Sequence, residues 1–395
     1  MATKSRKFDI VLFGATGFTG QLTADYLARN GGPTLRWALA GRNAEKLKLV
    51  RARLGDIDPA CKSLELLEAD SDNAEALRSV AESTKVVITT VGPYLKYGEP
   101  LVAACAAAGT DYVDLTGEPE FVDLMWLRYH EQAQKSGARI VHSCGFDSIP
   151  HDLGAWFTVK QLPEGVPLKV EGFVRAGGDF SGGTFHSAVN QFSRLRQYAR
   201  VRSERHAREG RPDGRRIGAV KAGVRYVKEL GNWAVPFPTI DPQIVRRSAA
   251  ALERYGPEFR YGHYVLVKKI TGVAKLVGGV SVLLAGSQLE FLRKRLLKFK
   301  QPGQGPSEEQ RRKSWFKVSF CGEGGGERVR CEVSGGDPGY GETSKMLAES
   351  ALCLAFDTLP KTAGSVTTAQ AMGDALTARL QKAGIQFRVV EKTAA

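Results

Sequence analysis

Short apolar runs alternate with amphipathic segments over the first 150 residues of the chain. Each run ends at a glycine or a polar residue, and in the intervening segments apolar positions recur three and four residues apart. The runs lie at residues 10–13, 35–40, 64–67, 86–91, 112–115 and 138–142. Strands of this length, joined by helical crossovers, predict a parallel, doubly wound α/β sheet.

The first run stops at a glycine-rich turn and is followed by a helical pattern. Gly14 permits a tight turn, Gly17 lets backbone approach a pyrophosphate, and Gly20 lets the helix pack on the strand. Glycines also collect in turns for steric reasons alone, but a strand before them and a helix after them favour a dinucleotide site of the Rossmann type. The other residues of this predicted cofactor site are Ala15, Thr16, Phe18 and Thr19.

Beyond residue 154 the pattern changes to that of a mixed α/β domain. Residues 168–174 alternate like a half-buried strand, and residues 315–320 and 329–333 flank a glycine-rich turn, as in an antiparallel hairpin. Thr343 and Thr367 resemble helix caps, and residues 386–390 resemble a last strand. We expect a Rossmann domain at 1–153, a substrate or dimerisation domain at 154–342, and C-terminal helices at 343–395 that pack back on the first domain.

The most apolar segment of the chain is residues 276–292. It is interrupted by Gln288 and Glu290, and a membrane-spanning helix needs about 20 apolar residues with few charges, so spanning is not expected. A buried or interfacial helix is favoured. The alternative is a peripheral membrane helix, which the basic run Arg293, Lys294 and Arg295 would support.

Composition narrows the class of protein. The chain has 395 residues, 43% of them hydrophobic and 25% charged, which excludes wholesale disorder. The six cysteines form no C-x-x-C pair and the six histidines show no paired spacing, so we expect a reducing compartment and no metal site. The first strand pattern begins close to Met1, so we expect no signal peptide and a cytoplasmic protein.

Positive charge is concentrated in the middle of the chain. The formal net charge is +14, and residues 151–300 carry 27 basic and 12 acidic side chains. Nine arginines fall between Arg194 and Arg216, in a segment that predicts a helix followed by a polar loop. The excess indicates either a solvated basic face or attraction to an anionic surface or an acidic ligand.

Several residues near the predicted strand ends are candidates for cofactor binding. Arg42 stands where an acidic residue would bind the ribose of NAD, and a guanidinium suits the 2′-phosphate of NADP, unless it is only a solvated arginine at a turn. Asp70 either meets the adenine or caps the next helix. Ligands bind at the carboxyl ends of strands in such sheets, which adds Val91, Gly92, Pro93 and Gly117.

No motif identifies a catalytic acid. Tyr97 and Asp147 are our candidates for a proton donor, with water as the alternative. His142 and His151 are further polar groups near the expected nicotinamide, and each could instead cap a helix. Cys144 is not needed for hydride transfer and fits a small buried side chain.

Four segments together resemble one known family. The segments GATGFTG, AGRN, VGPYLKYGEPLVAACAAAGTDYVDLTGE and GFDSIPHDLG are similar to those of the saccharopine dehydrogenase-like oxidoreductases, and within them to the trans-acting enoyl reductases. The resemblance implies a Rossmann domain closed by C-terminal helices, a second α/β domain that often dimerises, and NAD(P). For the trans-acting branch it implies reduction of an acyl or polyketide double bond in lipid and glycolipid biosynthesis, and an association with membranes.

The leading hypothesis is an NADPH-dependent enoyl reductase acting on an acyl chain. Its basic domain would receive an acidic carrier protein or a lipid surface, and we expect a cytoplasmic homodimer, peripheral at the inner face of the plasma membrane. One alternative is a saccharopine-type amino-acid reductase. Another is an NADP-binding scaffold at a lipid surface without turnover. Nucleic acid is not an expected partner, because the arginine run lacks interleaved aromatic residues apart from Tyr198.

Overall fold

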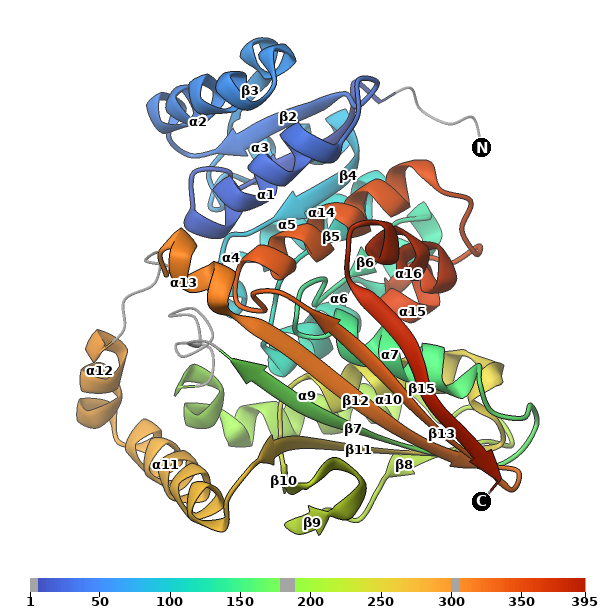
Figure 1. Ribbon diagram of the computed structural model, residues 1–395. Coiled ribbons are helices and arrows are strands. Elements are labelled where there is room, and N and C mark those ends of the chain that lie inside the picture. Colours follow the sequence, from blue (N-terminus) through green and yellow to red (C-terminus); the bar gives the residue numbers. More distant parts are fainter. Residues whose placement is uncertain (1–5, 178–188, 300–305, 395) are drawn as a thin grey trace. The chain divides into compact units, whose positions relative to one another are not determined.

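The computed structural model describes residues 6–177, 189–299 and 306–394. The chain forms two compact units (Figure 1). Within the described residues the first unit comprises 6–146 and 340–380, and the second comprises 147–299, 306–339 and 381–394. The predicted boundary at 153 therefore lies inside the second unit, whose first helix begins at Ile149.

The first unit contains a parallel sheet whose seven described strands have the order β14-β6-β5-β4-β1-β2-β3. This order reverses between β1 and β4, as in dinucleotide-binding folds, so the predicted doubly wound sheet is confirmed. The seventh strand, β14, comes from the C-terminal part of the chain, pairs with β6, and was not predicted. The strands are β1 (Phe8–Phe13), β2 (Trp37–Gly41), β3 (Glu65–Glu68), β4 (Thr84–Thr89), β5 (Asp111–Val113), β6 (Arg139–Val141) and β14 (Gly364–Val366).

Helices cover both faces of this sheet because its central strands are apolar on both sides. Val11 and Phe13 of β1 belong to a core that includes residues of α3, α5 and α6, while α1 packs on α2 and α14. Asn43 caps α2 as predicted, accepting a hydrogen bond of 2.8 Å from the backbone of Lys46. The helices are α1 (Phe18–Asn30), α2 (Ala44–Ile57), α3 (Ala74–Ser83), α4 (Tyr94–Tyr97), α5 (Glu99–Ala108), α6 (Pro119–Ser136), α14 (Gly341–Phe356), α15 (Thr368–Ala371) and α16 (Gly373–Lys382), with a 3-10 turn, η1 (Pro59–Ser63).

The second unit contains a mixed sheet that carries eight strands in the described residues. Its order is β15-β13-β12-β7-β11-β10-β9, with β8 also pairing with β11. The predicted hairpin is present as the antiparallel pair β12 and β13. The strands are β7 (Leu168–Gly177), β8 (Arg216–Ala219), β9 (Arg225–Val227), β10 (Asn232–Pro236), β11 (Glu258–Val267), β12 (Trp315–Gly324), β13 (Glu327–Gly335) and β15 (Gln386–Ala394).

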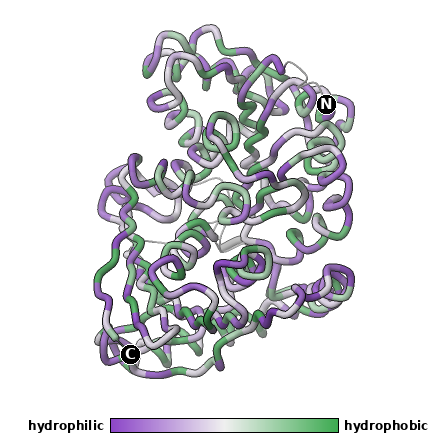
Figure 2. Tube along the Cα trace, turned by 90° about the vertical axis from the view of Figure 1, so that its right-hand side faces the viewer, coloured by the Kyte–Doolittle hydropathy of each residue, from purple (hydrophilic) through white to green (hydrophobic). Residues whose placement is uncertain are grey.

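The helices of the second unit include a long apolar one. They are α7 (Ile149–Val159), α9 (Leu195–Glu209), α10 (Asp241–Ala251), α11 (Ile270–Gln288), α12 (Glu290–Phe299) and α13 (Glu308–Lys313), with 3-10 turns η2 (Lys228–Leu230) and η3 (Glu253–Tyr255). Figure 2 shows that hydrophobic stretches recur along the traces of both units. In the second sheet, Phe173 and Tyr264 stack with ring centroids 5.3 Å apart within a small apolar cluster.

Two predictions about the C-terminal region are wrong. Residues 343–395 do not all return to the first domain, because β15 pairs with β13 and so extends the second sheet. Thr343 does not cap α14, which begins two residues earlier after Tyr340; its hydroxyl instead accepts a 3.0 Å hydrogen bond from the backbone of Phe146. Thr367 does cap α15, accepting from the backbone of Gln370 at 3.3 Å.

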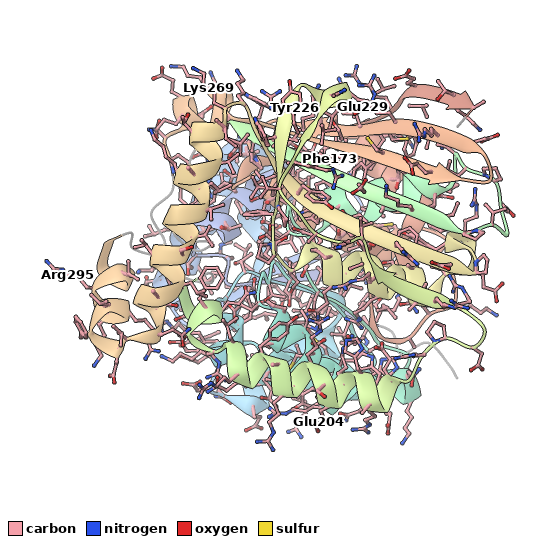
Figure 3. All side chains as sticks on the ribbon, turned by 90° about the horizontal axis from the view of Figure 1, so that it is seen from below. Phe173, Glu204, Tyr226, Glu229, Lys269 and Arg295 are labelled. Atoms are coloured by element: carbon pink, nitrogen blue, oxygen red, sulfur yellow. The ribbon has the colours of Figure 1, made fainter. Side chains whose placement is uncertain are left out.

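The helix predicted at residues 276–292, buried or interfacial, is not buried. Its residues lie in α11 and α12, and only 11% of the apolar window of α11 is buried. By length and composition alone α11 could cross a membrane. Figure 3 shows α11 with Lys269 at its start and Arg295 on the following α12. Val282 is 73% exposed and Phe291 is 69% exposed, so this segment presents apolar surface rather than filling a core.

Candidate functional site

The turn between β1 and α1 is held by its own backbone. The Gly14 amide donates to the carbonyl of Ala40 at 2.9 Å, and the Gly14 carbonyl accepts from the Gly17 amide at 3.0 Å. The hydroxyl of Thr90, just after β4, donates to the same carbonyl at 3.1 Å. The turn is therefore anchored to the ends of both neighbouring strands, at the point where the strand order reverses.

Backbone conformation and packing within the protein explain two of the three glycines of this turn. Gly14 has φ +87°, a conformation that favours glycine, and a Cβ at Gly20 would lie 2.2 Å from the Gly14 carbonyl oxygen. A Cβ at Gly17 would come no closer than 3.4 Å to protein atoms, which is an ordinary contact. Packing therefore accounts for Gly14 and Gly20 and leaves Gly17 to be explained by something that approaches from outside.

The amino end of α1 fits a pyrophosphate. Gly17 is the exposed N-cap, no side chain caps the helix, and no acidic residue occupies its first turn. A helix end of this kind offers backbone N–H groups and the positive end of the helix dipole to an anion. Ala15 is buried, Thr16 and Thr19 are half-buried, and the ring of Phe18 packs edge-on against Tyr340 at 4.8 Å.

The predicted adenosine-side residues follow the next two strands. Arg42 is exposed and comes directly after β2, whose Ala40 carbonyl anchors the glycine turn. Asp70 is half-buried after β3, where its carboxylate accepts from the Ser71 hydroxyl at 3.2 Å. Asp70 does not cap α3, because Asn73 does so by accepting from the backbone of Ala76 at 3.0 Å. Both residues thus lie at the carboxyl edge of the sheet, as the prediction requires.

The predicted nicotinamide-side residues lie in the loops after β4 and β5. Val91 and Pro93 are half-buried, Gly92 is exposed, and Gly117 is half-buried. The two loops are joined by Glu118, whose carboxylate accepts from the backbone amides of Tyr94 at 3.1 Å and Leu95 at 2.9 Å. Sequence reasoning did not assign this role to Glu118. An acidic residue directly before the helix would have been a signal, but here the carboxylate comes from another loop.

Tyr94 is a structural residue rather than an acid. Its hydroxyl donates to the Thr89 carbonyl at 3.3 Å and accepts from the Leu115 amide at 3.2 Å. Burial, together with nearby Asp114, raises its pKa well above the ordinary value. Tyr97 differs, because it is half-buried at the end of α4 with the ammonium of Lys96 4.7 Å from its ring centroid.

Asp114 fixes the ends of β5 and β6. This fully buried carboxylate accepts from the backbone amides of Thr116 at 3.0 Å and Ser143 at 2.9 Å, and lies 2.7 Å from Nδ1 of His142. His142 is therefore part of the scaffold. Cys144 is fully buried and its thiol donates to the Val141 carbonyl, which agrees with its expected structural role.

Asp147, the other predicted proton donor, belongs to the second unit. Burial and the neighbouring charge of Asp241 raise its pKa to about 7. His151 follows on α7 and is 1% exposed; burial lowers its pKa to about 3, so its imidazole is neutral near pH 7. Neutral His151 cannot donate the proton of an imidazolium, whereas Asp147 can carry an acidic proton at neutral pH.

The nine arginines between Arg194 and Arg216 fall into two groups: some make contacts that hold the fold together, and the others are exposed. Arg205 is buried and pairs with Glu209, and half-buried Arg215 donates to carbonyls at the end of α10, including Ala249 at 2.8 Å. The predicted helix is α9, and its Arg196 and Arg200 are exposed one turn apart. The other exposed arginines of the segment are Arg194, Arg202, Arg208, Arg211 and Arg216.

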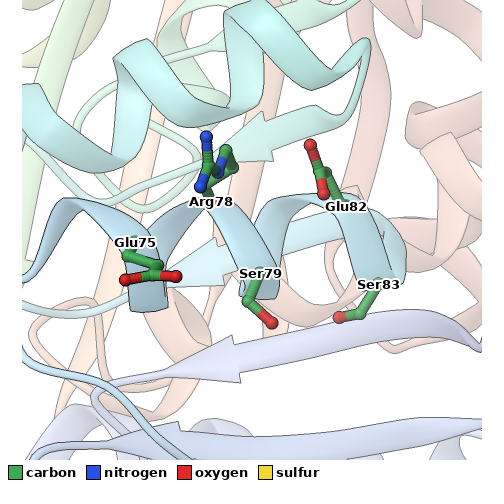
Figure 4. Close-up of a pocket in the computed structure, with 5 residues that line it drawn as sticks. All are labelled: Glu75, Arg78, Ser79, Glu82 and Ser83. Atoms are coloured by element: carbon green, nitrogen blue, oxygen red, sulfur yellow. The ribbon is translucent and has the colours of Figure 1, made fainter.

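A hollow of about 360 Å³ lies along α3 (Figure 4). It is lined by Glu75, Arg78, Ser79, Glu82 and Ser83. Since α3 leads into the amino end of β4, its last turn lies at the opposite edge of the sheet from the glycine turn. We assign no ligand to it.

Comparison with known proteins agrees with the cofactor geometry. A family model described as the saccharopine dehydrogenase NADP binding domain matches residues 10–141. This span contains the glycine turn, Arg42, and the loops after β3, β4 and β5. The predicted NADP cofactor is thereby confirmed.

Relatives that match over their full length are named as a reductase and an oxidoreductase. A protein of Mycobacterium tuberculosis named trans-acting enoyl reductase is 38% identical over 98% of this chain and 98% of its own length. A protein of Bos taurus named saccharopine dehydrogenase-like oxidoreductase is 33% identical over 100% of both chains. Among solved structures, the saccharopine dehydrogenase (L-Glu forming) of Saccharomyces cerevisiae has a TM-score of 0.55 at 12% identity, over 97% of this chain and 100% of that one. The last likeness concerns the fold alone.

Proposed function

Because the chain belongs to the saccharopine dehydrogenase-like oxidoreductases, we propose that it is an NADPH-dependent enoyl reductase acting on an acyl or polyketide chain. The observation that carries this proposal is its full-length similarity to proteins named trans-acting enoyl reductase. We place the reaction in lipid or glycolipid biosynthesis. The α,β-unsaturated chain would be a thioester, because a thioester carbonyl activates the β-carbon toward hydride.

The residues at the carboxyl edge of the first sheet would hold the cofactor. Gly17 and the amino end of α1 bind the pyrophosphate, and Arg42 binds the 2′-phosphate. Asp70 meets the adenosine end, and Val91, Gly92, Pro93 and Gly117 face the nicotinamide end. Bound NADPH supplies a hydride, and the substrate α-carbon then requires a proton.

We propose Tyr97 as the group that delivers this proton. It is half-buried beside the nicotinamide-side loop, it carries a hydroxyl that can give up a proton, and the ammonium of Lys96 lies 4.7 Å from its ring centroid. Asp147, whose pKa of about 7 suits proton transfer near neutral pH, is the alternative donor. Replacement of the true donor would lower kcat while leaving NADPH binding unchanged.

We further propose where the protein acts and what it contacts. Exposed arginines of α9 suit an acidic carrier protein that bears the acyl chain, and the exposed apolar surface of α11 with basic residues at both ends suits an anionic lipid surface. A cytoplasmic protein bound at the inner face of the plasma membrane would combine these features. The expected homodimer is tested by sedimentation of the purified protein.

The decisive experiment is a turnover assay with purified protein, NADPH and a series of enoyl thioesters. NADPH oxidation should be accompanied by a product two mass units heavier, and Tyr97→Phe should reduce kcat at least tenfold with unchanged NADPH affinity. Turnover of saccharopine with NADP, and of no enoyl thioester, would instead establish the amino-acid reductase. NADPH binding without turnover of either class would leave a scaffold.

A further inference from the structure

Three polar side chains of the second unit, from two helices and one strand, lie close together in the fold. His151 is on α7, Asp241 is the first residue of α10, and His263 is on β11. Nε2 of His263 lies 3.4 Å from one carboxylate oxygen of Asp241, and Nε2 of His151 lies 3.9 Å from the other. One ligand atom from each residue falls within 4.8 Å of the other two.

The negative charge of the buried Asp241 carboxylate is only partly compensated by the residues that the structure describes. Asp241 is 2% exposed, and its Oδ2 accepts a hydrogen bond from the Thr239 hydroxyl, whereas Oδ1 has no hydrogen-bond partner among the described residues. Its position at the amino end of α10 is worth at most about 2 kcal/mol. Burial of a carboxylate costs several kcal/mol, so this site calls for a positive charge.

His263 is oriented as a ligand. Its Nδ1 lies 3.3 Å from the hydroxyl of Tyr261, which fixes the ring and directs Nε2 toward Asp241. Nε2 is buried and has no hydrogen-bond partner in the part of the chain that the structure describes. A buried ring nitrogen and a buried carboxylate oxygen of the same cluster thus both lack a hydrogen-bond partner among the described residues.

We propose that His151, Asp241 and His263 bind a divalent transition-metal ion, with zinc as the best match. Two imidazole nitrogens and one carboxylate are a common zinc ligand set, and a fourth position would remain for water. In a tetrahedral zinc site, ligand atoms are about 3.3 Å apart. The 3.4 Å pair has this spacing, and His151, whose Nε2 lies 3.9 Å from the other carboxylate oxygen, would move closer on binding.

The ion would supply the missing positive charge and join α7, α10 and β11. None of the three ligands is among the predicted NADPH-binding residues, and the proposal does not depend on enoyl reduction. It differs from the sequence-based expectation of no metal, which relied on the absence of closely spaced histidines. The ligands are far apart in the chain, so spacing could not reveal them.

The test is metal titration of the full-length protein, prepared without a histidine tag and stripped with a chelator. Zinc should bind with one ion per chain and raise the melting temperature. His151→Gln and His263→Gln should each weaken zinc binding by roughly 100-fold. His206→Gln, which changes an exposed histidine on α9, is the matched control and should leave zinc binding unchanged.

A second measurement covers the case in which the variants do not fold. Wild-type protein loaded with Co²⁺ should show the intense visible absorption of a four-coordinate site. Absence of stoichiometric zinc binding and of this absorption in wild-type protein would overturn the proposal. Zinc binding that persists in folded His151→Gln and His263→Gln would also overturn it, because the ion would then bind elsewhere.

Discussion

The hydroxyl of Thr90 donates a 3.1 Å hydrogen bond to the carbonyl oxygen of Gly14, joining the turn after β1 to the loop after β4. These are the two strands between which the order of the sheet reverses. The same carbonyl oxygen accepts from the Gly17 amide and faces Gly20. The cofactor turn is therefore rigid before any ligand arrives, and mutations can separate its folding role from its binding role.

Gly20→Ala should mainly reduce stability, whereas Gly17→Ala should mainly reduce NADPH binding. A methyl group at Gly20 would lie 2.2 Å from the Gly14 carbonyl, so we expect a loss of about 1–3 kcal/mol in the free energy of unfolding. Gly17→Ala should cost less than about 1 kcal/mol, since its methyl meets no protein atom closely. It should nevertheless weaken NADPH binding at least tenfold, measured by nicotinamide fluorescence. Unchanged NADPH affinity in Gly17→Ala would place the pyrophosphate elsewhere.

Arg42→Ala should distinguish the two nicotinamide cofactors. Hydrogen bonds to a charged group contribute about 1.5–3 kcal/mol, so the dissociation constant for NADPH should rise roughly 10- to 100-fold. NADH lacks the 2′-phosphate, and its affinity should change less than about twofold. Arg29→Ala removes an exposed arginine at the other end of α1 and serves as the control. Equal weakening of both cofactors would show that Arg42 does not contact the 2′-phosphate.

The basic face of α9 should matter only for carrier-linked substrates. In the double variant Arg196→Gln, Arg200→Gln, we expect a higher KM and a weaker salt dependence with an acyl chain on an acidic carrier protein. The same chain on free pantetheine should be reduced with unchanged kinetics. Arg205 and Arg215 are unsuitable for this test, because their contacts support α9 and α10. A variant that behaves like wild type with the carrier would exclude docking at this face.

The apolar helix α11 should bind lipid directly. We expect wild-type protein to float with vesicles that contain anionic lipid, and Val282→Glu to weaken this binding about tenfold by replacing an exposed valine. Leu49→Glu is the matched control, since Leu49 on α2 is 70% exposed and Val282 is 73% exposed. If wild type does not float but forms a dimer that Val282→Glu dissociates, α11 is instead an interface between two copies.

The first sheet could be predicted because its signals are local. Each central strand is a continuous apolar run, and Gly14, Gly17 and Gly20 follow the first of them directly. β14 was not predicted, because its three residues, Gly364–Val366, form no such run. They join the sheet only by pairing with β6.

The sequence could not predict whether α11 is buried, nor which side chains far apart in the chain lie close together in the fold. Apolar residues such as Val282 and Leu284 are compatible equally with a buried and an exposed helix, and only the fold shows that α11 is exposed. Asp241 and His263 likewise gave no signal, because His151 lies far from both in the chain. For the cofactor site, the sequence predicted residues that the structure places at the strand ends, whereas the scaffold role of Glu118 needed the structure.

Asp9 should make the stability of the protein depend on pH in the acidic range. Burial alone would raise the pKa of Asp9, but hydrogen bonds from Arg36 and the nearby Lys85 ammonium outweigh it and lower the pKa. The ionised group therefore stabilises the fold above the unfolded-state pKa of about 3.9, and this stability is lost as pH falls through the lower folded-state pKa.

Asp9→Asn should reduce the free energy of unfolding at pH 7 by about 1–2 kcal/mol, below the usual range for buried pairs because both cations are half-exposed. In urea unfolding the difference from wild type should shrink progressively as the pH falls below about 3.9. Asp56→Asn, which removes an exposed carboxylate on α2, should change stability by less than about 0.5 kcal/mol over the same pH range. A difference between wild type and Asp9→Asn that stays constant with pH would mean that packing of the side chain, rather than its charge, stabilises the fold.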